Sequence, residues 1–229
     1  MNSQNSHKKN AASIAAKYVK DGMTIGLGTG STVQFFLDEL AELINKENFS
    51  ITGVCTSSAT EHEAQKLNIP IVPLQKDTLI DLTVDGADEI DNHLNLIKGG
   101  GGALYREKLI AKNSKTVVII ADESKKVDFL GAFPLPIEIT KFGNELIQRK
   151  IEDFLPSTSL RKNADGSVFE TDNNNYILDC KLEHTNSLLH LEEELKLITG
   201  VVETGLFINI ADIAIVNNNK IEKDESQYA

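Results

Sequence analysis

The stretch LIDLTVDGADEID, residues 79–91, decides the fold because a mostly apolar run leads directly into an acidic turn. Residues 79–84 are predicted to form a buried strand, and Asp85 and Gly86 stand where that strand stops and the chain turns. In sheets of parallel strands flanked by helices, ligands bind at this end of the strands. The stretch therefore predicts a polar site at the edge of a parallel α/β sheet.

A second apolar run followed by a polar turn comes shortly afterwards. Residues 94–97 are predicted as a short strand, and Lys98 with the glycines that follow it leads into a helix opening near Ala103. Glycine allows the backbone to approach a ligand closely. We therefore expect the two strand ends to direct polar groups toward one crevice.

The first half of the chain alternates short apolar runs with amphipathic ones. The predicted strands are 23–27, 51–54, 69–74, 79–84, 94–97 and 116–121. Helices are expected between most of them. Such alternation predicts an α/β fold, a mostly parallel sheet with flanking helices that is Rossmann-like.

The pattern changes after Gly131, where the segments become typical of a small β-α-β-β-α-β unit. These segments are 137–139, 143–154, 157–161, 176–182, 188–198 and 201–207. The polar, turn-rich residues 163–175 lie between two of the strands, as in a hairpin. The sequence therefore predicts a second, α+β domain.

The last apolar strand, 211–216, is expected to return to the main sheet, so the second domain is an insertion. We predict a main α/β catalytic domain of residues 1–130 and 208–229 and a smaller inserted α+β (ferredoxin-like) domain of residues 131–207. The length of 229 residues and the hydrophobic fraction of 41% suit such an arrangement.

Charge and cysteine content restrict the partners. The formal net charge of −11 disfavours nucleic acid, and a phosphate-bearing ligand must be held by local donors. Cys55 and Cys180 form no C-x-x-C pair, which argues against a disulfide framework or a cysteine-rich zinc site. No apolar stretch approaches the ~18 residues of a membrane span, and residues 1–10 do not resemble a signal peptide. We therefore expect a cytoplasmic protein that binds no membrane.

Residues 26–32, GLGTGST, are a candidate phosphate site. They follow a predicted strand and open a helical pattern, so N–H groups and the hydroxyls of Thr29, Ser31 and Thr32 converge where the helix dipole favours an anion. The alternative is a tight turn in which Ser31 or Thr32 caps the helix. The spacing matches neither G-x-x-x-x-G-K-[ST] nor G-x-G-x-x-G, which favours a sugar phosphate or mononucleotide over NAD.

The acidic turn has two interpretations. Asp85 and Asp88 bracket Gly86 and Ala87. This spacing can direct both carboxylates toward one bound polyol, or it can be an ordinary Asp-Gly turn with capping aspartates. Metal binding is not expected, because the spacing is not that of an EF-hand and the histidines form no H-E-x-x-H cluster.

Two charged residues follow the acidic turn. Lys98, at a strand end before a glycine run, can stabilise an oxyanion, or it can be a solvated charge. Glu107 follows one helical turn beyond Ala103. Its neighbours Arg106 and Lys108 leave open the alternative of a surface helix face with salt bridges.

These motifs together resemble the A-type ribose-5-phosphate isomerase family. The resemblance is carried by residues 26–32, 84–90, 97–104 with 106–108, 121–125, 133–136, 200–202 and 205–207, in the family's order over nearly the whole chain. The combination of V-D-G-A-D-E-I with K-G-G-G-x-A-L-x-R-E-K is the most specific part. The departures are Gly102, where the family commonly has alanine, and the polar tail after Val216.

The resemblance implies reversible interconversion of D-ribose 5-phosphate and D-ribulose 5-phosphate in the pentose phosphate pathway, without a metal or organic cofactor. It implies that Glu107 is the base, that Lys98 stabilises an enediolate, that Asp85 assists ring opening, and that Asp88 holds hydroxyls. Lys8 or Lys9 would help to hold the phosphate. The implied substrate-binding residues are Thr29, Gly30, Ser31, Thr32, Asp85, Gly86, Ala87, Asp88, Lys98, Gly99, Gly100, Gly101 and Lys125.

The resemblance also suggests a homodimer or a dimer of dimers. Two other functions compete with the isomerase. A sugar-phosphate sensor would share the phosphate loop, but the stretch before Ala11 is too short for a DNA-binding segment and the acidic balance disfavours one. A relative of the acyl-CoA transferases would use a glutamate nucleophile, but Lys98 and the paired aspartates have no evident task in that chemistry.

Overall fold

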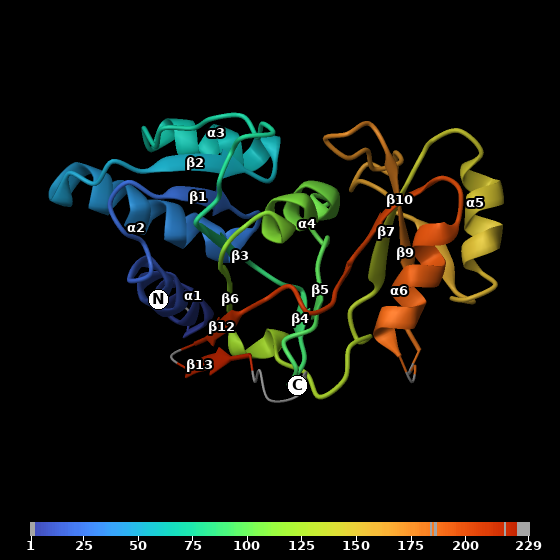
Figure 1. Ribbon diagram of the computed structural model, residues 1–229. Helices are drawn as coiled ribbons and strands as arrows, with labels where there is room; N and C mark the ends of the chain where they lie inside the picture. Colours follow the sequence, from blue (N-terminus) through green and yellow to red (C-terminus); the bar gives the residue numbers. More distant parts are fainter. Residues whose placement is uncertain (1–2, 184, 186, 218, 224–229) are drawn as a thin grey trace. The chain divides into compact units, whose positions relative to one another are not determined.

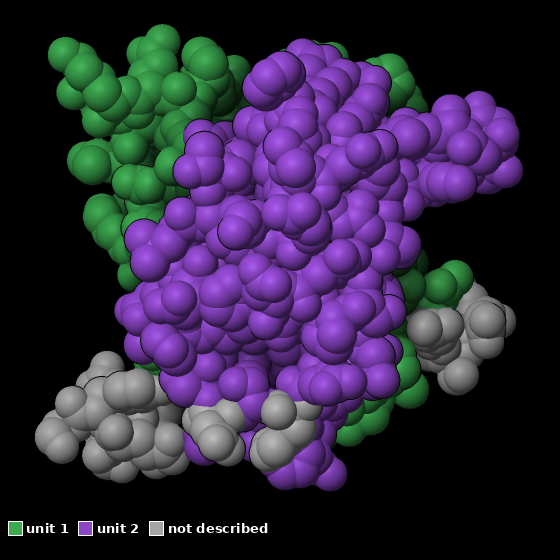
Figure 2. Space-filling model, turned by 90° about the vertical axis from the view of Figure 1, so that its right-hand side faces the viewer, with its two compact units in different colours: residues 1–87, 106–126, 209–229 green, residues 88–105, 127–208 purple. Residues whose placement is uncertain are grey.

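The chain divides into two compact units. The computed structural model describes residues 3–183, 185, 187–217 and 219–223. Unit 1 comprises Met1–Ala87, Arg106–Lys126 and Asn209–Ala229, and unit 2 comprises Asp88–Tyr105 and Val127–Ile208 (Figure 2). The division at residues 130/131 and 207/208 expected from the sequence stays a prediction, and unit 2 additionally takes in residues 88–105.

Unit 1 is built on a six-stranded sheet (Figure 1). In spatial order its strands are β13 (Asn219–Glu222), β12 (Ile213–Val216), β6 (Val117–Ala121), β3 (Leu82–Asp85), β1 (Thr24–Leu27) and β2 (Thr52–Cys55). Only the pairing of β13 with β12 is antiparallel among these described strands. The predicted mostly parallel sheet is confirmed, and so is the return of the C-terminal strand β12 to it.

Helices cover this sheet because its strands are apolar on both faces. The helices of unit 1 are α1 (Ser3–Ala16), α2 (Ser31–Glu47), α3 (Ser58–Lys66) and most of α4 (Leu104–Lys112), with the short 3₁₀ helix η1 (Glu123–Lys125). Alternate strand residues such as Ile25 and Leu27 pack with Phe36 and Leu40 of α2 in one core. On the other face, Ile110 of α4 lies so close to Gly26 that a Cβ there would be 2.8 Å from it.

The sheet contains a topological switch point between β1 and β3. The chain leaves β1 for β2 on one side, whereas β3 leads to β6 and β12 on the other. In open sheets of this kind, ligands bind beyond the carboxyl ends of the strands at the switch point. β1 ends at Leu27 and β3 ends at Asp85, so the fold places the glycine-rich loop and the acidic turn beside each other.

Unit 2 contains two small antiparallel sheets. The larger has the spatial order β10 (Val201–Thr204), β7 (Leu135–Ile139), β9 (Tyr176–Cys180) and β8 (Thr158–Leu160). With α5 (Asn144–Ile151) and α6 (Leu188–Leu197), its elements follow in the order β-α-β-β-α-β. The smaller sheet consists of β11 (Leu206–Phe207), β5 (Leu96–Ile97) and β4 (Glu89–Ile90).

Two strand expectations need correction. Residues 69–74 make only one bridge, between Ile71 and Gly53, since Pro70 and Pro73 have no N–H to continue a ladder. Residues 201–207 do not form one strand. Gly205 separates β10 from β11 by approaching the Lys98 carbonyl so closely that a Cβ would lie 2.4 Å from its oxygen.

The segment 94–97 also differs from the expectation. Only Leu96–Ile97 is a strand, and it pairs with β4 and β11 rather than with the parallel sheet. The sequence pattern could not reveal this, because a two-residue strand has no periodicity.

Candidate active site

The glycine-rich loop of unit 1 ends in a helix without a side-chain cap. Gly30 is the N-cap residue of α2, with a φ of 125°, and no side chain hydrogen bonds to the cap. Glycine suits this position because L residues rarely adopt positive φ. Ser31 and Thr32 are the first residues inside the helix, so the alternative in which one of them is the N-cap is wrong. The first N–H groups of α2 therefore remain suited to an anion.

Hydroxyl groups from a second strand end fix this loop. The Thr29 hydroxyl lies 2.7 Å from that of Thr56 and 2.8 Å from that of Ser57. Thr60 Oγ1 donates to the Gly28 carbonyl at 2.7 Å. Sequence reasoning missed this cluster, although its signal was present: residues 56–60, TSSAT, follow the predicted strand 51–54.

One of the two candidate lysines contacts the loop. Lys8 Nζ, on α1, donates to Ser31 Oγ at 2.8 Å. Lys9 lines a different cavity of about 570 Å³ along α2, together with Asp38 and Glu42. Of the pair, Lys8 is the one that the fold of unit 1 places at the glycine-rich loop.

Asp85 joins the acidic turn to the glycine-rich loop. Its side chain is buried, and Oδ1 accepts hydrogen bonds from Thr29 N at 3.0 Å and from Gly86 N at 2.7 Å. A Cβ at Gly28 would lie 2.1 Å from the same oxygen, so only glycine leaves room for the carboxylate. Asp85 therefore makes the bond of an Asp-Gly turn and also stands at the switch point.

Glu107, a residue of unit 1, is buried. It belongs to α4, and only 4% of it is exposed, while its neighbour Lys108 is 1% exposed. The alternative of a solvated helix face with surface salt bridges is therefore wrong for this residue. Burying a carboxylate costs free energy unless it is compensated, and such groups concentrate at functional sites.

Lys125 belongs to η1, which follows β6 directly, and its side chain is half-buried. Asp122 caps η1 by accepting from Ser124 N at 3.1 Å. Lys125 thus also lies after a carboxyl strand end of the parallel sheet, where ligands bind in such sheets. That it binds the phosphate stays a prediction.

Cys55, the last residue of β2, is the cysteine of unit 1. Burial, and secondarily the charge of Glu61, raises the pKa of Cys55 to about 12. Cys55 is therefore protonated near neutral pH and does not act as a thiolate nucleophile.

In unit 2, Lys98 is buried rather than solvated. Only 3% of it is exposed, its N–H donates to the Gly205 carbonyl at 2.9 Å, and Nζ lies 5.5 Å from the ring centroid of Phe207. The alternative of a solvated charge is wrong. A buried ammonium next to an apolar ring has a stronger field than one in water.

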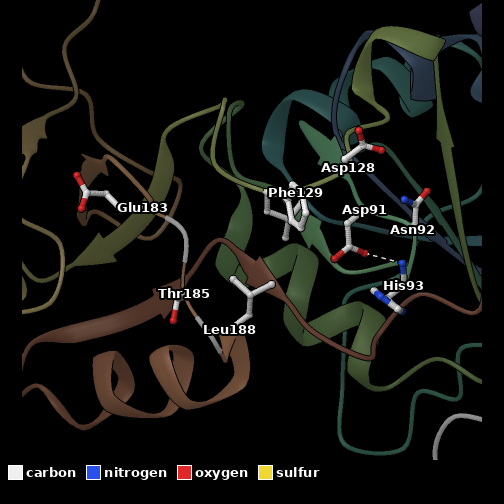
Figure 3. A pocket seen from close by; sticks show the side chains of 9 residues that line it. Asp91, Asn92, His93, Asp128, Phe129, Glu183, Thr185 and Leu188 are labelled. Carbon is white, nitrogen blue, oxygen red and sulfur yellow. Dashed lines mark hydrogen bonds between the residues drawn. The ribbon is translucent and has the colours of Figure 1, made fainter.

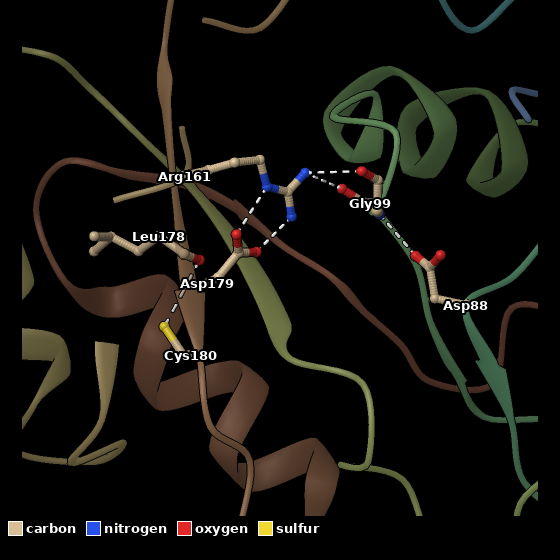
Figure 4. A network of polar contacts seen from close by, with 7 residues as sticks. Asp88, Gly99, Arg161, Leu178, Asp179 and Cys180 are labelled. Carbon is tan, nitrogen blue, oxygen red and sulfur yellow. Dashed lines mark hydrogen bonds and ion pairs between the residues drawn. The ribbon is translucent and has the colours of Figure 1, made fainter. Parts of the chain in front are cut away.

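The glycine loop after Lys98 is closed by hydrogen bonds (Figure 4). Asp88 Oδ2 accepts from Gly100 N at 2.7 Å, and Gly102 N donates to the Gly99 carbonyl at 2.9 Å. Gly99 and Gly102 have φ values of 102° and 80°, which explains the need for glycine. Asp88 therefore holds this loop through the N–H group of Gly100.

A separate cavity of about 390 Å³ lies in unit 2 near the turn between β4 and β5 (Figure 3). Its charged lining includes Asp91, whose Oδ1 accepts from His93 N and Asn95 N, both at 2.8 Å. Asp91 is thus engaged in the turn itself. Across the described residues, no three His, Cys, Asp or Glu side chains gather as a metal site requires.

The predicted site residues fall into two groups. Unit 1 brings Thr29, Ser31 and Asp85 together and also carries Glu107 and Lys125. Asp88, Lys98 and the glycines 99–101 belong to unit 2. That both groups face one crevice stays a prediction.

The family model described as ribose 5-phosphate isomerase A (phosphoriboisomerase A) matches residues 52–220. The chain is similar to ribose-5-phosphate isomerase A of Bacillus mycoides, with 51% identity over 91% of this chain and 94% of that protein. It is also 45% identical to ribose-5-phosphate isomerase A of Thermoplasma volcanium, over 96% of this chain and 97% of the relative.

Solved structures agree with these relatives. A D-ribose-5-phosphate isomerase in complex with phospho-erythronic acid has a TM-score of 0.92 and 40% identity, over 97% of this chain and 100% of that one. Ribose 5-phosphate isomerase from Plasmodium falciparum has a TM-score of 0.90 and 40% identity, over 95% and 99% of the two chains. No helix in the described part of the chain combines the length and apolar character needed to cross a membrane.

Proposed function

The chain belongs to the ribose 5-phosphate isomerase A family, and we propose that it interconverts D-ribose 5-phosphate and D-ribulose 5-phosphate through an enediolate, as a step of the non-oxidative pentose phosphate pathway. The observation that carries the proposal is the burial of Glu107, which is 4% exposed on a helix whose neighbouring positions are charged. A carboxylate kept from water is suited to act on a carbon-bound proton.

In this mechanism Glu107 removes the proton from C2 of the open-chain aldose and returns it to C1. The negative charge that develops on the enediolate oxygens is stabilised by Lys98 and by N–H groups of the loop 99–101. Asp85 assists ring opening and moves a hydroxyl proton, and Asp88 holds sugar hydroxyls. A positioned base contributes about 10²- to 10⁴-fold, so these other groups share the acceleration. The reaction requires no metal or organic cofactor.

The phosphate is held by the loop 29–32 at the N-terminus of α2. Lys8, which lies 2.8 Å from the Ser31 hydroxyl, and Lys125 supply positive charge. Because the protein carries a net charge of −11, its overall field does not attract the anionic phosphate, so these local donors must bind it. The energy of holding the phosphate can then be expressed at the reacting carbons.

The substitution Glu107→Gln tests the proposal, since it keeps the shape of the side chain and removes its basicity. We expect the variant to stay folded, to bind a sugar-phosphate inhibitor such as arabinose 5-phosphate, and to lose isomerisation by at least ~10²-fold. Exchange of the C2 proton of ribose 5-phosphate with solvent deuterium, followed by NMR, should be lost as well.

The exposed Glu47→Gln at the end of α2 is the matched control and should leave turnover unchanged. Retained turnover in Glu107→Gln would refute its role as the base. Retained deuterium exchange without turnover would assign the base to another group, of which Asp85 is the first to test.

We further propose a cytoplasmic protein that assembles as a homodimer or a dimer of dimers. The family resemblance supports the assembly, and unit 2 exposes apolar side chains that an interface would cover: Phe142 is 94% exposed, Leu197 78% and Leu146 66%. Light scattering at micromolar concentration should give a multiple of 25.1 kDa. A mass near a single chain would refute the assembly.

A further inference from the structure

The loop 99–102 is fixed by an arginine from the hairpin of unit 2 (Figure 4). Arg161 Nη1 donates to the Gly99 carbonyl at 2.7 Å and to the Gly100 carbonyl at 3.1 Å. Arg161 lies 62 residues after Gly99 in the chain and directly follows β8. Two consecutive peptide groups of the candidate active-site loop therefore depend on one guanidinium.

The guanidinium itself has little freedom. Its Nε donates to Asp179 Oδ2 at 2.9 Å and its Nη2 to Asp179 Oδ1, a bidentate pair. Its Cζ lies 5.8 Å from the ring centroid of Phe169, and the Arg161 side chain is only 13% exposed. A planar fork held on one edge by a carboxylate presents its remaining donors in a fixed direction.

The contact of Arg161 with these two carbonyls also determines where the N–H groups of the same peptides point. The Gly99 carbonyl and the Gly100 N–H belong to one peptide group, which is held by Arg161 at one end and by Asp88 at the other. In a trans peptide the C=O and the following N–H point in opposite directions. By holding the Gly100 carbonyl, Arg161 therefore directs the Gly101 N–H away from the hairpin.

The hairpin that carries Arg161 is itself anchored. The Phe169 ring lies so close to Gly102 that a Cβ there would be 2.4 Å from Cζ. Glu138 of β7, fully buried, accepts at Oε1 from the side chains of Thr171 at 3.0 Å and Asn175 at 2.9 Å. A buried carboxylate at the base of the turn thus fixes the hairpin against the sheet.

We propose that Arg161, held by Asp179, is a positioning residue that sets the N–H groups of the loop 99–101 for the developing oxyanion. This inference rests on the proposed function, in which that loop stabilises the enediolate. Arg161 acts through the loop and touches no reacting atom. Lysine cannot replace it, because one ammonium cannot hold both Asp179 oxygens and both carbonyls.

The test compares Arg161→Lys and Arg161→Met with Lys141→Met. The control removes a cation of unit 2 that forms an ion pair with Glu170 at 2.6 Å without contacting the loop. Steady-state kinetics on ribose 5-phosphate should show kcat lowered roughly 10-fold or more in both Arg161 variants with a much smaller change in KM, since a lost oxyanion donor costs ~10²- to 10³-fold and a misdirected one less. The control should match the wild type.

A second readout does not depend on activity. Exchange of the Gly100 and Gly102 amide hydrogens, measured by NMR, should be at least roughly 10-fold faster in Arg161→Met and unchanged in Lys141→Met. Guanidinium ion added to Arg161→Ala should restore part of kcat. If Arg161→Met does not fold, Arg161→Lys and Asp179→Asn give the same comparison.

Unchanged amide exchange and unchanged kcat in folded Arg161 variants would overturn the proposal. An inactive wild-type protein whose loop amides still respond to Arg161→Met would refute the proposed function alone. If Arg161→Lys and Lys141→Met lost kcat to the same extent and thermal stability to the same extent, the role of Arg161 would be structural only.

Discussion

The two glycine loops of this protein are held in different ways. The loop of unit 1, residues 26–30, is fixed by neutral hydroxyls and by Asp85, all of them at carboxyl ends of adjacent parallel strands. The loop of unit 2, residues 99–102, is fixed by the charged side chains of Asp88 and Arg161. The loop of unit 1 is thus held by residues at neighbouring strand ends. The loop of unit 2 is held by an arginine that lies 62 residues later in the sequence.

This difference has a physical cause. In a parallel sheet, the ends of neighbouring strands meet automatically, so short side chains such as threonine reach from one to the next. β5 is only two residues long and ends without such neighbours, since β4 and β11 run antiparallel to it. Its loop therefore needs long side chains with strong, directional bonds.

The largest effect is expected from Gly28→Ala, a substitution in the loop of unit 1, residues 26–30. The new Cβ would lie 2.1 Å from Asp85 Oδ1 and 2.6 Å from Asp85 Cα, and the backbone cannot move aside as a side chain can. Overpacking should cost about 1–3 kcal/mol of stability, and displacing Asp85 should lower kcat/KM by about 10²-fold. Urea unfolding and steady-state kinetics measure the two effects.

Two matched variants sharpen this prediction. Gly22, unlike Gly28, has a positive φ of 81°, but a new Cβ there would have no atom within 4 Å. Gly22→Ala should therefore lower stability through backbone strain alone and leave kcat/KM unchanged. Gly102→Ala meets the Phe169 ring, which can rotate, and should cost less activity than Gly28→Ala. If Gly102→Ala proved the more damaging, the expected difference between a clash with backbone at Gly28 and a clash with a side chain at Gly102 would be wrong.

A smaller effect is expected from Thr32→Ala, at the first turn of α2. Loss of a hydrogen bond to a charged phosphate should weaken substrate binding by about 1–3 kcal/mol. Binding of a non-phosphorylated sugar should change little, as isothermal titration can show. Thr24→Ala, at the opposite end of β1, is the control. Equal losses for both ligands would mean that this threonine only supports the helix.

The arrangement at the carboxyl ends of the parallel strands could be predicted from the sequence. A strand, a glycine-rich or acidic turn and a helix follow one another within a few residues, so the positions of Thr29 and Asp85 could be predicted without knowing any distant contact. The same holds for α2 and for the return of β12. The burial of Lys98 and Glu107 was left open, because charged neighbours in sequence say nothing about what packs on them.

The contact of Arg161 with the loop 99–102 could not be predicted from the sequence. Arg161 lies in a stretch rich in polar residues, a pattern that predicts only a hairpin, and no neighbouring residue in the sequence indicates a contact with Gly99. The hydroxyl cluster of residues 56–60 was missed for another reason, since threonine and serine after a strand are also typical of plain helix caps. Ser57 is such a cap for α3, accepting from Thr60 N at 3.1 Å.

The smallest effect is expected at the other end of the parallel sheet of unit 1, opposite the end that carries the glycine-rich loop. Asp81 accepts hydrogen bonds from Lys115 Nζ at 2.7 Å and from Thr24 N at 3.0 Å. Both bonds lower the pKa of Asp81, and the bond from Lys115 has the larger effect. A carboxyl whose folded pKa is lowered stabilises the protein above its unfolded value of about 3.9 and loses that contribution as pH falls through the folded pKa. Asp81→Asn should therefore destabilise at pH 7 and have no effect at a pH below both values.

Because Asp81 and especially Lys115 are partly exposed, the cost at pH 7 should be no more than about 1 kcal/mol, and kcat/KM should match the wild type. Urea unfolding of both proteins at pH 7 and at successively lower pH measures the difference. Lys115→Met should reproduce most of the same loss, since it removes the first cause of the pKa shift. A destabilisation that persists undiminished in acid would assign the effect to packing rather than charge, and a loss of activity would show that the two ends of the sheet are coupled.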